Sequence, residues 1–251
     1  VTGLPVPETP SDYAFCDNTS VGSDTDGFVN DFILKTKDLE ILGTLDINQY
    51  NVSYHTSANG AQTNASLDVI DKTIKYTNTT VNTQPIYVRV ESVDNTACFD
   101  ASKSFNIIVN PLPVVSGASI EQCIVAGDPN PTVDLTTAEI SISSTPNLTF
   151  EYFEDSSGLT PIPKSNAYPV IVNISQSVFV KAISDKGCAS ELVELVLNVG
   201  QTPNNLFDDL VAIECDDFLD PDGNDTTGMN DDTDNITNFF LNETAIVADI
   251  N

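Results

Sequence analysis

The side chains with the clearest chemical potential are aspartates, which crowd into two loops that each follow a cysteine. In both loops they recur at short spacing around glycines, Gly27 in the first and Gly223 and Gly228 in the second. Carboxylates that close on a glycine, which permits a sharp bend, are typical of a structural calcium site. The predicted ligands are Asp17, Asp24, Asp26, Asp31, Asp216, Asp220, Asp222, Asp225 and Asp231. The alternative is a solvated acidic loop, and neither loop is an EF-hand, because the twelfth-position glutamate is missing.

Five cysteines form the second set of reactive side chains. None has the CxxC spacing of a zinc or redox site, so disulfides are the better interpretation. One cysteine lies near the start and one lies late in each of two similar stretches of chain, and this order predicts the pairs Cys16–Cys98 and Cys123–Cys188. Cys215 is then left over, and we expect its partner beyond Asn251. Disulfides persist in oxidising compartments, which indicates an extracellular protein.

The sequence offers little for catalysis. It contains one histidine, His55, which lies in an alternating run where a strand residue is the simpler interpretation. There is no GxSxG elbow and no phosphate-binding loop. Acidic residues are too abundant to exclude a glycosidase by count, yet small β-domains offer no obvious cleft. We therefore expect no enzyme within these 251 residues.

The charge balance is strongly acidic. Thirty-seven acidic residues against nine basic ones give a formal net charge of −28, which repels nucleic acid and anionic lipid headgroups and favours cations. No apolar run reaches the roughly 18 residues that a membrane-spanning helix needs, so we expect no membrane insertion by this segment.

The elements that position these residues are strands. From Ile86 to Val90 and again from Phe105 to Val109, every second residue is apolar, which is the pattern of a half-buried strand. Residues 178–203 repeat the order of strand, loop, cysteine, strand and proline-containing exit. Helical periodicity is scarce, so sheets must pack on sheets to bury their apolar faces. The predicted fold is all-β, with tandem immunoglobulin-like (Greek-key) β-sandwich domains in an extended rod.

The spacing of the cysteines divides the chain into repeats. Cys16, Cys123 and Cys215 recur roughly every 100 residues, which suits a string of β-domains better than a solenoid. We expect a linker from a preceding repeat at 1–12, a first repeat at 13–113, a second repeat at 114–203 and an incomplete third repeat at 204–251.

Several short motifs in this sequence resemble those of a known family. YVRVES, a loop with the motif NTACF and a VNPLP exit, recurring after a loop that contains DG, are similar to the immunoglobulin-like or PKD-like repeats of very large surface adhesins. Those adhesins belong to gliding and related bacteria that export proteins by type IX secretion. The second repeat departs from the pattern, with VKAIS in place of VRVES. The resemblance implies a filament on the bacterial cell surface that attaches cells to substrata.

Three functions are compatible with these observations. The leading one is a structural stalk or filament segment of an adhesin, whose partners are the neighbouring repeats of the same chain and an unknown surface ligand. The first alternative is that the repeats bind a polysaccharide or protein themselves, although the tyrosines are scattered and there is no tryptophan to form a sugar platform. The second alternative is an accessory region of a secreted hydrolase.

Overall fold

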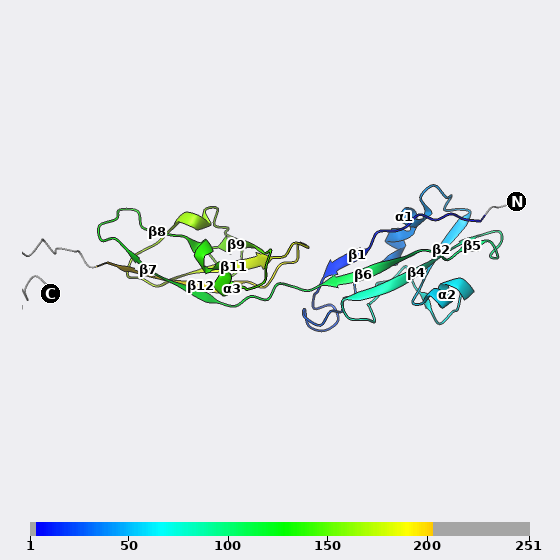
Figure 1. Cartoon of the computed structure of the whole chain (residues 1–251), viewed down its shortest axis with the longest axis horizontal. Helices are drawn as coiled ribbons and strands as arrows, with labels where there is room; N and C mark the ends of the chain where they lie inside the picture. Colours follow the sequence, from blue (N-terminus) through cyan, green and yellow to red (C-terminus); the bar gives the residue numbers. More distant parts are fainter. Residues whose placement is uncertain (1–3, 203–251) are drawn as a thin grey trace, which may run out of the picture. The chain divides into compact units, whose positions relative to one another are not determined.

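A computed structural model describes residues 4–202 of the chain (Figure 1). The predicted all-β fold is confirmed, because strands build the sheets of both repeats and the α-helices of the described residues are at most six residues long. The first repeat contains β1 (Tyr13–Cys16), η1 (Leu34–Lys37), α1 (Asp38–Leu42), β2 (Tyr50–His55), α2 (Ala58–Thr63), β3 (Val69–Ile70), β4 (Thr83–Ser92), β5 (Phe99–Asp100) and β6 (Ser104–Asn110). The second repeat contains β7 (Ala118–Ile124), β8 (Thr132–Val133), η2 (Leu135–Ala138), α3 (Glu139–Ile142), β9 (Thr149–Phe153), η3 (Ser165–Ala167), β10 (Tyr168–Pro169), β11 (Gln176–Ile183) and β12 (Val193–Gln201).

The two repeats share one strand order. The sheet of the first repeat runs β1-β6-β4-β2-β3, with β5 added beside β4, and that of the second runs β7-β12-β11-β9. In both, the first strand lies next to the last strand of its own repeat. The β1–β6 pair is parallel, whereas β6–β4 and β4–β2 are antiparallel. Tandem immunoglobulin-like β-sandwich domains therefore describe the chain, and their arrangement as an extended rod stays a prediction.

The alternation seen in the sequence sets the core of the first repeat. Ile86, Val88 and Val90 of β4 are buried, as are Phe105, Ile107 and Val109 of β6. The other half of this core comes from a segment without long strands, in which Phe32, Leu34 and Ile41 are fully buried. This second layer of the sandwich has little strand structure: Phe32 and Tyr76 form one isolated antiparallel bridge. In the second repeat the corresponding thin sheet is the β8–β10 pair.

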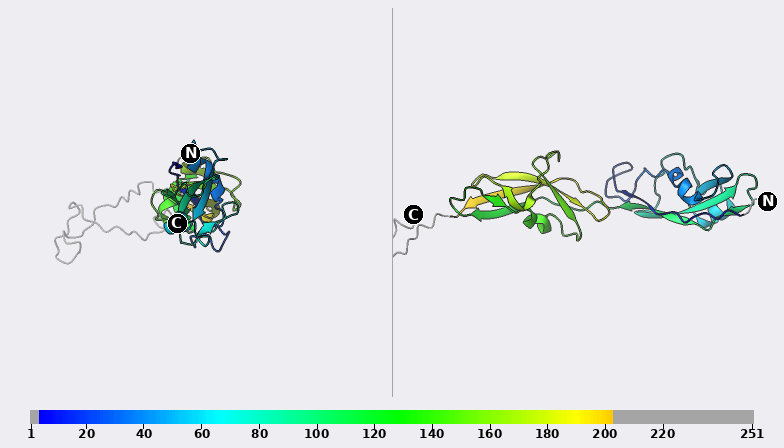
Figure 2. Two further views of the ribbon diagram at one scale, coloured as in Figure 1. Left: turned by 90° about the vertical axis from the view of Figure 1, so that its right-hand side faces the viewer. Right: turned by 90° about the horizontal axis from the view of Figure 1, so that it is seen from above.

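The outward face of the first sheet is covered, which the alternation alone did not predict. Figure 1 shows α1 and α2 on opposite sides of the strands. The side chain of Arg89, on β4, reaches α2. Arg89 Nη1 donates to the carbonyls of Ala61 (3.1 Å) and Gln62 (3.3 Å), near the end of α2. His55 on the neighbouring strand is consequently fully buried. The views in Figure 2 show these short helices against the strands from two further directions.

Candidate functional site

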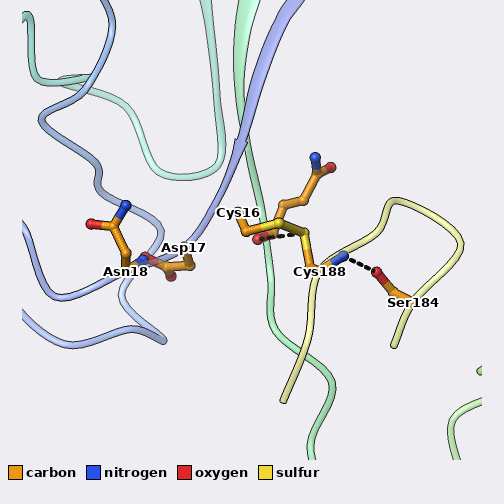
Figure 3. The surroundings of a disulfide bond; sticks show 6 residues. Cys16, Asp17, Asn18, Ser184 and Cys188 are labelled. Atoms are coloured by element: carbon orange, nitrogen blue, oxygen red, sulfur yellow. Dashed lines mark hydrogen bonds between the residues drawn. A yellow bond between two sulfur atoms is a disulfide. The ribbon is translucent and has the colours of Figure 1, made fainter. Parts of the chain in front are cut away.

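A disulfide links the two repeats, and its first half lies at the end of β1. Cys16 is the last residue of this strand and lies opposite Asn110, the last residue of β6. The backbone N–H of Asp17 donates to the Asn110 carbonyl at 2.9 Å, which extends the ladder by one bond. The parallel pairing therefore places Cys16 beside the point where the chain leaves the first repeat (Figure 3).

The second half of the bond lies in the loop between β11 and β12. Ser184 N donates to the carbonyl of Cys188 at 2.9 Å, and Cys188 N donates to Ser184 Oγ at 3.2 Å. Gly187 adopts a positive φ of 78°, which the turn requires and which glycine accepts without strain. Cys188 is fully buried, so this turn holds its sulfur in one place.

Cys16 and Cys188 are 172 positions apart in the sequence, yet their Cα atoms are 5.5 Å apart. That distance lies within the usual range for a disulfide. Cys188 Sγ also lies 4.0 Å from the Asn110 carbonyl oxygen, which is a contact and not a hydrogen bond, because a bonded sulfur carries no proton. The two repeats are thus joined twice, by the chain through residues 111–117 and by this bond (Figure 3).

The predicted pairs Cys16–Cys98 and Cys123–Cys188 are wrong. Cys98 bonds through its carbonyl to Ser92 N at the carboxyl end of β4, whereas Cys16 lies beyond the Thr83 end of the same strand. At about 3.3 Å per residue, the strand separates the two cysteines by roughly 30 Å, far beyond the reach of a disulfide. Cys188 is occupied by Cys16, and Cys123 is therefore a free, exposed thiol.

The prediction failed because it assumed that each disulfide forms within one repeat. The structure instead joins the early cysteine of one repeat to the late cysteine of the next. Cys98 is the counterpart of Cys188, since Ser92 N donates to its carbonyl at 2.9 Å as Ser184 N does to that of Cys188. Cys98 is a half-buried free thiol. Cys215 lies outside the described residues.

The aspartates of the first loop each form their own hydrogen bonds. Asp17 is 4% exposed, and its carboxylate accepts from the backbone N–H groups of Asn18 (2.9 Å) and Gly27 (2.8 Å). Asp26 accepts from the N–H groups of Ser23 (3.0 Å) and Phe28 (2.9 Å). These carboxylates serve as hydrogen-bond acceptors for backbone N–H groups of the loop.

The remaining predicted calcium ligands of this loop are Asp31 and Asp24. Asp31 bonds to Lys75 and to the side-chain amide of Asn18, and the Lys75 ammonium lowers the pKa of the Asp31 carboxyl. Asp24 is half-buried. Within residues 4–202, no three His, Cys, Asp or Glu side chains are grouped so that they could hold a metal ion. The structure therefore does not bring Asp17, Asp24, Asp26 and Asp31 together as one calcium site. Asp216, Asp220, Asp222, Asp225 and Asp231 lie outside the described residues, and calcium binding there stays a prediction.

His55 occupies a structural position. Its Nε2 lies 3.0 Å from Ser53 Oγ, and its Nδ1 is buried without a hydrogen-bond partner in the described part of the chain. Burial lowers the pKa of the imidazole, and the positive charge of Arg89 lowers it further. Arg89 is itself held by Glu91, at 2.8 Å, and by the face of the Phe99 ring, at 3.5 Å from the ring centroid.

A known protein family matches both repeats of the chain. The family described as Flavobacterium inter-domain disulphide bond domain (FIDD) matches residues 12–113 and 119–203. The chain belongs to this family. The two matched FIDD domains are the first and second repeats, and the Cys16–Cys188 bond joins one domain to the other. Family and disulfide together fit an extracellular or surface protein that serves as a structural or surface-binding module.

Solved structures add only remote likenesses. An I-band fragment from titin is 12% identical with a TM-score of 0.30, over 80% of this chain and 67% of that chain. Drosophila N-cadherin domains are 13% identical with a TM-score of 0.22, over 62% and 57%. A SusE-like surface located polysaccharide binding protein from Bacteroides thetaiotaomicron is 10% identical with a TM-score of 0.22, over 79% and 35%. At such TM-scores these likenesses carry no argument about fold or function.

No curated protein matches the chain. Within residues 4–202, no helix is long and apolar enough to cross a membrane.

Proposed function

We propose that this chain is a structural segment of the stalk or filament of a bacterial cell-surface adhesin. The observation that carries the proposal is the Cys16–Cys188 bond, which joins one FIDD domain covalently to the next. A second covalent link between two domains limits how freely they turn about the connecting chain. Restricted turning is useful in a stalk, whereas a catalytic site gains nothing from it.

Charge and redox chemistry support an extracellular position. Disulfides persist where thiol reductants are scarce, as outside bacterial cells. A net charge of −28 keeps an exposed protein soluble and discourages contact with nucleic acid or anionic lipid. The role is structural and not catalytic, which agrees with the burial of the chain's single histidine. The resemblance to adhesins of gliding bacteria extends the proposal to attachment during gliding and to export by type IX secretion.

The pairing rule also supports neighbouring repeats as partners. If early and late cysteines of successive FIDD domains pair throughout an array, Cys98 bonds to a preceding domain and Cys123 to a following one. Their free thiols in this segment are then the attachment points for those neighbours. Peptide mapping of the unreduced protein from intact cells checks this: we expect Cys123 linked to a different FIDD domain, and a free Cys123 thiol there would contradict it.

The cell-surface role is tested in a flavobacterial strain that carries the protein. Antibodies against residues 12–203 should label intact cells, and an in-frame deletion of this segment should reduce the fraction of cells that stay attached to glass under flow. An Asp94→Ala substitution at an exposed position is the control, because it leaves the Cys16–Cys188 bond and both free thiols in place. Labelling only after lysis, or unchanged attachment of the deletion strain, would overturn the proposal.

A further inference from the structure

The Cys16–Cys188 bond changes which residues carry tension when the ends of the chain are pulled. Everything from 17 to 187 lies inside a covalent loop closed by this bond. Tension that enters before Cys16 passes through the two sulfurs to Cys188 and leaves through the residues that follow. We propose that this bond shields residues 17–187 from tension applied through the polypeptide before Cys16 and after Cys188, so that both FIDD domains behave as a short link that does not lengthen while Cys98 and Cys123 are unpaired.

The shielded loop contains nearly all of the packed structure of the first domain. Every buried residue of its hydrophobic core, from Val29 to Val109, lies between the two cysteines. Strands β2, β3, β4, β5 and β6 are likewise inside the loop. Unfolding of this core therefore cannot add to the end-to-end length while the bond is intact.

The regular elements on the loaded side are already extended. In the first domain the load reaches Cys16 along β1, which has four residues. In the second domain it leaves Cys188 along β12, which has nine residues. Strands rise about 3.3 Å per residue, close to the limit of about 3.6 Å for a fully stretched chain, so these strands offer little further extension.

The expected mechanical difference is large. The bond spans 172 positions, and at about 3.3–3.6 Å each they amount to roughly 600 Å of chain that becomes available only when the bond opens. A dimeric or entangled chain would not produce this length, because it is set by the positions of the two cysteines.

Single-molecule stretching of the full chain, held at its two ends, tests the proposal. The reference protein carries Cys98→Ser, Cys123→Ser and Cys215→Ser, which removes every other thiol. The comparison protein adds Cys16→Ser and Cys188→Ser. The terminal residues contribute equally to both proteins, so their fully stretched lengths differ only by the closed loop.

We expect the unreduced reference protein to stop roughly 600 Å short of the comparison protein. A phosphine added under constant force should then release that length in one step. The phosphine attacks one sulfur, the S–S bond breaks, and water supplies the oxygen of the phosphine oxide and the protons of the two thiols. Equal lengths before reduction, or a step of another size, would overturn the proposal.

The readout does not depend on whether the five-serine protein folds, because fully stretched lengths are compared. It is also independent of the attachment assay. A failure of attachment with a hidden loop of the expected length would reject the adhesin role and leave the shielding intact.

Discussion

At the scale of single residues, the first aspartate loop is best understood as a set of backbone acceptors. Asp17 is the most buried of them, and one carboxylate bonds two N–H groups on either side of the loop. Removing an acceptor from a buried donor costs the desolvation of that donor, about 1–3 kcal/mol. The same type of residue at an exposed position carries no such cost.

Asp17→Ala should therefore lower the free energy of unfolding by about 1–3 kcal/mol. The reason is that Gly27 N–H loses its partner in a buried setting. Chemical denaturation monitored by fluorescence measures the change, and Asp94→Ala, at an exposed position, is the control. Equal stability of the two variants would show that the carboxylate is not structural.

Calcium binding by the third loop has its own test. If Asp222 and Asp225 bind the ion, a chelator should lower the melting temperature of the full chain, and Asp222→Asn with Asp225→Asn should abolish that effect. Asp26→Asn, in the loop whose carboxylates bond to amides, should leave it unchanged. Calorimetric melting with and without chelator is the measurement, and a chelator without effect would remove the metal.

His55 makes a prediction about pH. Its folded pKa is lowered, chiefly by burial, while the unfolded chain keeps a value near 6.5. Between these values the unfolded state binds more protons, so this group stabilises the fold less and less as pH drops below about 6.5. Because the chain has one histidine, its ¹H NMR titration is unambiguous. We expect a pKa below that of the same chain in urea, and an equal or higher value would contradict the burial.

At the scale of elements, the two domains fasten a short helix to a strand in the same way. Tyr54 Oη of β2 donates to Asp38 Oδ1 of α1 at 2.8 Å, and Tyr152 Oη of β9 donates to Glu139 Oε1 of α3 at 2.9 Å. Burial raises the pKa of both phenols, so both remain donors. In α1, Ile41 and Leu42 are buried in the core, whereas Leu39 is exposed.

Tyr54→Phe should therefore destabilise the first domain by about 1.5–3 kcal/mol, the usual cost of losing a hydrogen bond to a charged group. Tyr168→Phe is the matched control, since Tyr168 Oη donates to Glu154 at 2.7 Å in a more exposed place. Tyr168→Phe should lower the free energy of unfolding by less, because water can replace the lost hydrogen-bond partner at this more exposed position. Urea unfolding of the two variants compares them, and a larger effect at Tyr168 would contradict this account.

At the scale of the whole molecule, the disulfide closes a loop of 172 positions. In the chain-entropy model a loop of this size stabilises by at most about 5 kcal/mol. Cys16→Ser with Cys188→Ser should lower the melting temperature, whereas Cys98→Ser with Cys123→Ser should not. Calorimetry measures both, and peptide mapping of the unreduced chain should recover the Cys16–Cys188 peptide pair. Recovery of a Cys16–Cys98 pair would overturn the observed connection.

The sequence by itself determined where the main strands lie and that the two stretches are copies of one β-domain. Alternation is a local property, so Ile86 to Val90 and Phe105 to Val109 could be assigned to strands without knowing what packs on them. Its five cysteines, none with CxxC spacing, also predicted disulfides. It did not reveal that α2 covers the face of His55, because that contact joins segments with no shared pattern.

Only the tertiary structure decided which cysteines meet. Distance along a chain says little about distance in space once strands have paired. Because β1 runs parallel to β6, Cys16 lies at the exit of its own domain and roughly a strand's length away from Cys98. The carbonyl of Asn110 and the buried turn around Cys188 complete that position, and neither has a signature in the order of residues.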